Sequence, residues 1–595
     1  MSTNLQPSVP ARPTFKGRAY DRDGSEAYSA HAYQYATTSQ DPTEYKEREL
    51  PPSSMAPAFV VFVADDPDII AAINYARDNN LGVAVRSGGH QYIGSSSTSG
   101  NNIQIDLSGR EADPTVPYPY KTREINRLEG TVTLGAGVNV DEVCEFAIKN
   151  GIFFPHGECI GVHMGGHSQT GGFSVITPTF GVMIDYMVRF TIILADGTRR
   201  TVERESTQPD DRDLWWAVLG GSPGNFGVVT SITVRYLDDS HYPESRGFKQ
   251  AWLYSKDKLL ELVQLINEFS DDPNRDPDFA FSLMALGAEY DAETPWSSLP
   301  DTWDNEMMQK YPYLAGTDRF YWVLPTIVVF GVWTNSKGEG QYDEKLVQAV
   351  FERFRSVAGM LPEKLLKYAP GDELDLMDGK KATPMSQILK ALTFENPREF
   401  NMSCKKLAWF GKNTKTMSKP QPALGNRTFA EWLSSKVAKL ESDWFIDEVR
   451  GLKAAIQVGM LGGEGLANVA RPTSLAHRDG NYWFAFDVFY DPAIPGLYEK
   501  TIALTNDIAA QVTTNQVGLW DDDRERRLLL GPSIVLNEEA VLDKLHGLYY
   551  DSDGDYERLR RLKKRWDPKH VFTPNLFCIG ATTCDRFARD TAVTD

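Results

Sequence analysis

The chain has 595 residues, of which 41% are hydrophobic and 24% are charged. This composition is typical of a soluble globular protein and excludes a disordered or collagen-like chain, and at roughly 100–200 residues per domain the length predicts several domains. Asp and Glu number 81 against 62 for Lys and Arg, so the net charge of -19 disfavours binding to nucleic acid or to an anionic membrane surface.

The N-terminal 55 residues are polar and rich in proline, and they contain no continuous apolar run of the kind that a secretory signal needs. The most apolar run, residues 320–333, is interrupted by Pro325 and is shorter than the roughly 20 residues that cross a bilayer. The five cysteines form no CxxC pair and no dense framework, which is typical of a reducing compartment. We therefore expect a cytoplasmic protein, or a secreted one if a signal has been removed from the sequence.

The first regular elements follow residue 56. Residues 59–64 form a β-branched apolar run that predicts a strand, and the residues after it have helical spacing. Short strands are also predicted at 82–86 and 103–107, on either side of a loop rich in Gly and Ser. Further short strands then alternate with glycine-rich segments and one helix at 140–149, which Asn139 can cap. This half predicts a mixed α/β domain.

The sequence pattern changes near residue 239. Glycine clusters disappear, and aromatic strand-like runs alternate with helical stretches such as 342–357. The last patterned stretch, 555–575, predicts a basic helix that stops at Pro568 and returns to the first domain. The chain is thus predicted to consist of a lead-in over 1–55, a first domain over 56–240, a second domain over 241–545 and a C-terminal segment over 546–595.

Three glycine-rich segments in the first domain carry the chemistry. The first, residues 86–94, follows a predicted strand, and its glycines let backbone N–H groups turn toward an anion such as a pyrophosphate. A plain surface turn is the alternative, because the spacing is neither GxGxxG nor that of a Walker loop.

The second segment, residues 157–172, contains Cys159, His163 and His167 at intervals of four. On a helix these would share one face, as in a zinc site, but the interspersed glycines each cost about 1 kcal/mol in a helix interior. We therefore expect no metal and an extended loop packed against a flat ligand. The third segment, residues 213–230, again runs from glycine into a strand. Three such loops in one domain indicate one extended ligand.

These three segments, in this order, resemble the FAD-linked oxidases of the vanillyl-alcohol-oxidase type, and most closely their berberine-bridge-enzyme-like branch. The resemblance covers about residues 56–237 and resumes over 556–559 and 566–572, which resemble the closing pattern of that branch. It implies an α+β fold: a two-domain flavoprotein with a PCMH-type FAD-binding domain, and a substrate domain whose antiparallel sheet and helices cover the flavin.

The resemblance implies that FAD is bound covalently twice, through His90 to the flavin 8α-methyl group and through Cys159 to flavin carbon 6. Imidazole and thiolate are nucleophiles that can add to an electron-poor flavin, and both links should raise its potential. Thr170 and Ser174 stand where the branch has glycines, so cofactor contacts there are expected to differ. The other cofactor-binding residues implied are Arg86, Ser87, Gly88, Gly89, Gln91, Tyr92, Gly94, Val162, Gly165, Gly166, His167, Gly171, Gly172, Gly224, Asn225, Gly227, Val228 and Val229.

Oxidation of an alcohol is assisted by a base that takes the hydroxyl proton. The resemblance places Tyr490 near the position where some members carry a glutamate base, and strand alternation puts Asp487 on the opposite face from Tyr490. Glu538 stands where many members carry a tyrosine base, although a solvated surface glutamate is the alternative. The predicted catalytic candidates are therefore Glu538, Tyr490 and Asp487.

The predicted function is that of an oxidase. A hydride passes from a hydroxyl-bearing carbon of a sugar, alcohol or secondary metabolite to FAD, and O2 is reduced to H2O2; Val162 favours O2 as acceptor because oxidases of the branch also have valine there. Two alternatives stay open: oxidative cyclisation or C–C bond formation on a secondary metabolite, and a non-catalytic protein that stacks sugars on aromatic strands such as 482–490. The sequence leaves the substrate and the oligomeric state open.

Overall fold

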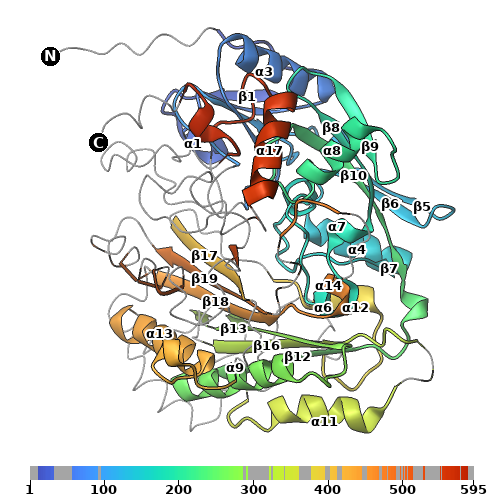
Figure 1. The fold of residues 1–595 in the computed structure, drawn as a ribbon, viewed down its shortest axis with the longest axis vertical. Helices are drawn as coiled ribbons and strands as arrows, with labels where there is room; N and C mark the ends of the chain where they lie inside the picture. Colours follow the sequence, from blue (N-terminus) through green and yellow to red (C-terminus); the bar gives the residue numbers. More distant parts are fainter. Residues whose placement is uncertain are drawn as a thin grey trace.

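The computed structural model describes residues 11–32, 56–90, 96–285, 326–338, 342–360, 377–394, 403–411, 418–444, 452–467, 472–476, 482–490, 553–575 and 578–586, with shorter pieces elsewhere. Within these ranges helices and strands are mixed, and sheets of four, five and seven strands form the framework (Figure 1). The α+β fold class predicted from the sequence is confirmed.

The smallest of these three sheets holds the first predicted strands. β2 (Phe59–Phe62), β4 (Ile103–Asp106) and β3 (Val83–Arg86) are parallel with β4 in the middle, and β1 (Arg18–Asp21) pairs antiparallel with β2. Helix α3 (Asp66–Asp78) connects β2 to β3. The strands predicted at 59–64, 82–86 and 103–107 are confirmed. Because β3 ends at Arg86, the first glycine segment begins at the carboxyl edge of a parallel sheet, where ligands bind in open α/β sheets.

The second sheet is antiparallel. Its order is β5 (Arg123–Asn126), β6 (Thr131–Gly135), β10 (Val228–Arg235), β8 (Met187–Ile193) and β9 (Arg199–Glu203). The third glycine segment therefore runs directly into the central strand β10, as predicted.

Helices in this half are more numerous than the sequence predicted. Helix α4 (Val140–Asn150) forms as predicted, and Asn139 and Glu142 make a reciprocal capping box at its N-terminus. Helix α8 (Pro209–Val218) was missed, although Pro at its first position and two aspartates in its first turn are a helix-start signal. The second glycine segment, expected to be extended throughout, contains one helical turn, α5 (Met164–His167).

The seven-stranded sheet is antiparallel and forms the lower half of Figure 1. Helices α9 (Lys256–Asp271), α11 (Glu344–Arg355) and α13 (Phe429–Trp444) cover one face of it. The strand order is β12 (Arg246–Leu253), β16 (Thr326–Trp333), β13 (Phe279–Ala285), β18 (Leu452–Met460), β19 (Tyr482–Tyr490), β17 (Ser403–Gly411) and β20 (Arg527–Leu528).

Strand alternation separates the two faces of this sheet. Phe281 and Leu283 of β13 and Phe484 of β19 are buried in the same hydrophobic cluster as the helices, so this face is closed. Ser282, between Phe281 and Leu283, has the opposite parity. The register pairs Met284 with Gln457 and Gln457 with Ala485, which places Ser282, Gln457 and Trp483 on the face turned toward the first domain.

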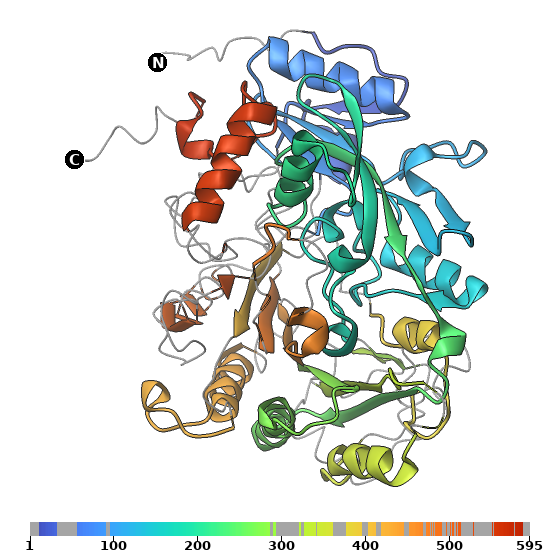
Figure 2. The same cartoon turned by 45° about the vertical axis from the view of Figure 1, so that its right-hand side comes forward.

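The C-terminal helix α17 (Asp553–Trp566) packs against α8, and Figures 1 and 2 both place it beside the first domain. Lys563 is fully buried and donates to the backbone oxygens of Asn225 at 2.5 Å and Phe572 at 2.8 Å, while its charge pairs with Asp567. Helix α17 therefore contacts elements of the first half of the chain. The boundaries of the four predicted parts stay a prediction. No helix in the part of the chain that the structure describes is long and apolar enough to cross a membrane.

Candidate active site

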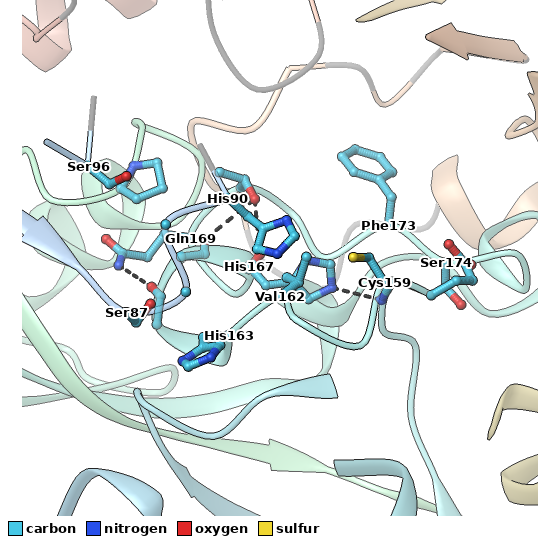
Figure 3. Close-up of a pocket in the computed structure, with 18 of the residues that line it drawn as sticks. Ser87, His90, Ser96, Cys159, Val162, His163, His167, Gln169, Phe173 and Ser174 are labelled. Carbon is cyan, nitrogen blue, oxygen red and sulfur yellow. Dashed lines mark hydrogen bonds between the residues drawn. The ribbon is translucent and has the colours of Figure 1, made fainter. Parts of the chain in front are cut away.

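A pocket lies where the glycine segments of the first domain meet the open face of the seven-stranded sheet (Figure 3). Its lining includes all three glycine segments on one side, and Ser282, Gln457 and Trp483 on the other. Sequence segments more than 350 residues apart thus contribute to one site.

The first glycine segment leaves β3 and lines the pocket with Ser87, Gly88, Gly89 and His90. A Cβ atom on Gly88 would lie 2.8 Å from the Gly161 oxygen and 2.9 Å from Cδ2 of His163, so this position accepts only glycine. Gly89 has φ at +71°, a backbone conformation that residues with a side chain rarely adopt. These two glycines let the backbone turn sharply and bring the His90 ring to the pocket, as Figure 3 shows.

The second segment is tied to the second half of the chain through Phe394. Phe394 N–H donates to the Glu158 oxygen and Ile160 N–H donates to the Phe394 oxygen, both at 3.0 Å, so that Cys159 and Phe394 form a parallel bridge. Cys159 lines the pocket, and it forms no disulfide with the other cysteines whose side chains the structure describes. His90 and Cys159, predicted to hold the flavin, are therefore brought to the same pocket.

Helix α5 presents Gly165, Gly166 and His167 to the pocket. A Cβ on Gly166 would meet no heavy atom within 4 Å among the described residues, so the missing side chain leaves open space directly against the backbone. A flat ring can therefore approach this turn closely. The sequence prediction of an extended loop was wrong here, and the predicted packing against a flat ligand stays a prediction.

His167 is neutral in this environment. Removal from bulk solvent, with a smaller effect of nearby His156, lowers the pKa of His167 to about 3. Nε2 of His167 accepts the Gly157 N–H at 2.9 Å, so the ring proton belongs on Nδ1. His167 thus offers one N–H donor at the pocket wall.

His156 supports this arrangement from behind. Burial lowers the pKa of His156 and raises the pKa of Cys144 to about 12, so both groups are uncharged. Nδ1 of His156 lies 2.9 Å from the Gly157 oxygen, and Nε2 lies 3.8 Å from Sγ of Cys144. The N–H of Gly157 is therefore bonded to one neutral imidazole, that of His167, and its oxygen to another, that of His156.

Glu158 is a pocket carboxyl that the sequence reasoning did not single out. It is partly covered, its open surface lies in the cavity, and its depth in the molecule raises its pKa to about 7. Oε1 accepts the Val175 N–H at 2.5 Å, which opposes that rise. The sequence could have suggested Glu158, because its carboxylate stands between Gly157 and Cys159, inside a segment expected to touch the ligand.

On the sheet side, Gln457 lines the pocket and donates from Nε2 to Oδ2 of Asp487 at 3.4 Å. Asp487 is fully buried, behind Gln457 rather than in the lining. Its strand pairs with both neighbours without any register shift, so no bulge changes the alternation. Position 487 therefore lies on the same face of the sheet as Trp483, which faces the pocket, and position 490 lies on the opposite face.

The other predicted site residues fall into three groups. Eleven of the predicted cofactor residues line the pocket: Ser87, Gly88, Gly89, His90, Cys159, Val162, Gly165, Gly166, His167, Gly224 and Val229. Gln91, Tyr92, Gly94, Glu538 and the Tyr490 side chain lie outside the described residues. Arg86, Gly171, Gly172, Asn225, Gly227 and Val228 are described but lie outside the pocket lining.

The residues of the last group shape the wall from behind. Arg86 is buried in an ion pair with Asp106 and donates to the His31 oxygen. Its charge is therefore neutralised within the first sheet, away from the pocket. Gly171 and Gly172 have φ at +105° and +73° and form a turn that only glycine adopts easily. Oδ1 of Asn225 accepts the Ile579 N–H at 2.9 Å, and Val228 begins β10 directly after Gly227.

Two family models match the chain: the FAD binding domain over residues 57–203, and "berberine and berberine like" over residues 539–576. The FAD-linked oxidoreductase ffsJ of Aspergillus flavipes is 34% identical over 183 residues, which are 30% of this chain and 28% of that protein. The FAD-linked oxidoreductase easE of Claviceps purpurea is 31% identical over 233 residues, 38% of this chain and 47% of that protein. The match thus spans less than half the length of each of these relatives.

Solved structures share the fold over nearly the whole chain. The 6-hydroxy-D-nicotine oxidase of Arthrobacter nicotinovorans has a TM-score of 0.62 at 17% identity and covers 96% of this chain and 98% of its own. The berberine bridge enzyme of Eschscholzia californica has a TM-score of 0.62 at 16% identity, with 94% and 96% covered. The fold is that of these structures, and the matched domain is the FAD binding domain. The predicted resemblance to the berberine-bridge-enzyme-like branch is confirmed by both family matches and by the fold.

Proposed function

We propose that this protein is an FAD-dependent oxidase that acts on a hydroxyl-bearing carbon of a sugar, alcohol or secondary metabolite. One observation carries this proposal: a single pocket joins the glycine segments of the region matched by the FAD binding domain to polar and aromatic side chains of the seven-stranded sheet. A cofactor and a substrate can therefore meet there. The match to an FAD-binding domain favours this function over non-catalytic carbohydrate binding.

The residues of the pocket fit FAD. The turn at Gly166 leaves the backbone bare where a flat ligand would lie, and His90 and Cys159 supply two nucleophiles to the same cavity. We propose that both hold the flavin covalently. FAD, when bound, supplies a hydride acceptor and passes two electrons to O2, which gives H2O2.

The protein's own residues then bind, orient and exclude water. His167 offers its Nδ1–H to the cofactor, and the Gly157 peptide fixes its tautomer. Val162 lines the pocket next to the Cys159 segment, and its small side chain supports the use of O2. Phe173, Phe394 and Trp483 make the substrate side of the cavity apolar. Such a cavity suits a ring-bearing substrate.

Two measurements test the proposal. Peptide mass mapping of the purified protein should find one flavin bridging the peptides that contain His90 and Cys159. A panel of sugars, aromatic alcohols and hydroxylated secondary metabolites should include at least one that yields H2O2 in step with flavin reduction. A purified protein that holds no flavin, or that is reduced by substrates but releases no H2O2 in air, would contradict the oxidase assignment.

A further inference from the structure

We propose that Glu158 is the catalytic base of this pocket and takes the proton of the substrate hydroxyl group, while Ser282 and Gln457 hold that hydroxyl in place. This inference rests on the proposed oxidase function and assigns a proton acceptor that the sequence did not suggest. It places the base on the segment beside Cys159, whereas the predicted candidate Asp487 lies behind Gln457 on the sheet, outside the pocket lining.

Position is the first argument. Glu158 lines the main pocket and also a second, smaller cavity, and Ser282 and Gln457 line both of them as well. These three side chains come from the flavin-linked segment, β13 and β18, so they converge from both domains. A substrate hydroxyl between them would have one acceptor of its proton and two partners that fix its oxygen.

Charge is the second argument. Among the described residues that line the two cavities, Glu158 is the one Asp or Glu side chain, and no Lys or Arg side chain contributes. The other titratable groups that face the main pocket are His90, Cys159, His163 and His167. Asp487 does not line the pocket, but it is connected to the lining through its hydrogen bond with Gln457. Among the described residues, Glu158 is therefore the carboxylate placed to contact the substrate and accept its proton.

Hydrogen bonding is the third argument. Oε1 of Glu158 accepts the Val175 N–H, and the one other donor that acts on the carboxylate among the described residues is the backbone N–H of Glu158 itself. The backbone of Glu158 is also fixed, because its oxygen accepts the Phe394 N–H. One oxygen thus anchors the side chain and the other is available for the substrate. Depth in the molecule brings the carboxyl into the range where a base works near neutral pH.

The reaction balances with this assignment. The O–H bond breaks and its proton goes to Oε2 of Glu158, and the O–H electron pair becomes the second bond of the carbonyl. The C–H bond breaks and its hydride reduces the bound flavin by two electrons. Reoxidation by O2 needs one further proton to make H2O2, and the proton held by Glu158 supplies it. The smaller cavity, about 20 Å³, has room for one water molecule to exchange that proton.

Glu158→Gln tests the proposal, because Gln keeps an oxygen that can accept the Val175 N–H and so preserves the anchor. The matched control is Glu145→Gln, at an exposed position of α4. The first readout is independent of activity: the flavin absorbance of the substrate-free holoenzyme is titrated with pH. We expect a step near pH 7 in the natural protein and in Glu145→Gln, and none in Glu158→Gln. A step that persists in Glu158→Gln overturns the proposal.

The second readout is the rate of flavin reduction in anaerobic stopped flow. Glu158→Gln should lower it by about 10²–10⁴-fold and remove the pH dependence, since that is the usual effect of losing a general base. A rate within threefold of natural overturns the proposal. If Glu158→Gln attaches no flavin, the spectral titration of Asp487→Asn tests the proposal instead. The proposal expects this variant to keep the step near pH 7. Loss of the step would assign the titration to Asp487 and overturn the proposal. If no hydroxylated substrate reduces the natural enzyme, the oxidase function fails while the spectral titration still tests Glu158.

Discussion

The buried carboxyl of Glu158 makes the stability of the protein depend on pH in a way that can be calculated. Its pKa is raised from 4.5 to about 7 in the folded protein, because burial disfavours the charged form. At 1.36 kcal/mol per pKa unit, this difference corresponds to about 3 kcal/mol, an upper value since the cavity side of Glu158 keeps some water.

The sign follows from proton binding. Below pH 4.5 the carboxyl is protonated in both the folded and the unfolded protein, and above pH 7 it is ionised in both. Between these values the folded protein holds more protons, so the free energy of unfolding falls as the pH rises. Gln does not titrate. Glu158→Gln should therefore gain up to about 3 kcal/mol relative to the natural protein between pH 4.5 and pH 7, and nothing further above pH 7.

Denaturant unfolding of the holoenzymes at several pH values measures this difference. The transition to follow is the one that releases flavin fluorescence, because a protein of this size need not unfold in one step. Glu145→Gln serves as the control, and its difference from the natural protein should stay constant with pH. If the difference between Glu158→Gln and the natural protein is the same at pH 5 and pH 8, Glu158 is not a buried titrating group and the reasoning fails.

Three further predictions concern the flavin side of the pocket. Cys159→Ala should leave the flavin attached through His90 alone, which peptide mass mapping would detect as a flavin on one peptide; unchanged attachment would remove Cys159 from the site. Val162→Ile adds one methylene to the pocket lining and should slow reoxidation by O2 more than reduction by substrate, as stopped-flow traces of the two half-reactions would show. His167→Gln keeps an acceptor for the Gly157 N–H but does not titrate. The pKa of His167 is lowered from 6.5 to about 3, so the free energy of unfolding of the natural protein should fall as the pH drops below 6.5. The variant should lose up to about 5 kcal/mol less of this free energy by pH 3. Unfolding measured at each pH tests this difference.

The flavin side of the site could be predicted because its information is local. Gly88, Gly89 and His90 follow directly on a strand that the apolar pattern predicts, and Cys159 lies in a single glycine-rich segment. Backbone conformations that only glycine adopts are visible in the sequence as glycine. The wrong prediction at α5 has the same origin. Glycine disfavours a helix interior, so the sequence favoured an extended segment, but α5 is a single helical turn that begins at the buried Met164.

The substrate side could not be predicted in the same way. Ser282 and Gln457 are 175 residues apart in the sequence, and they share a cavity because β13 and β18 pair in one particular register. A shift of that register by one residue would turn Gln457 toward the helices and bring Val458 to the pocket. Nothing in the sequence near either residue specifies this pairing. The prediction of a base from strand alternation alone was therefore limited to placing Asp487 and Tyr490 on opposite faces, with no means to say which face meets the flavin.

Glu158 falls between these two cases. It lies in the local segment that the sequence singled out, but its relation to the substrate depends on a long-range contact, the pairing of Phe394 with residues 158–160. That contact holds the flavin-linked segment against the second half of the chain, so the residue before Cys159 reaches both cavities. The proposed flavin attachment and the proposed proton acceptor thereby depend on the same three residues of backbone. A substitution that moves Phe394 should disturb both together, whereas Glu158→Gln should disturb proton transfer alone.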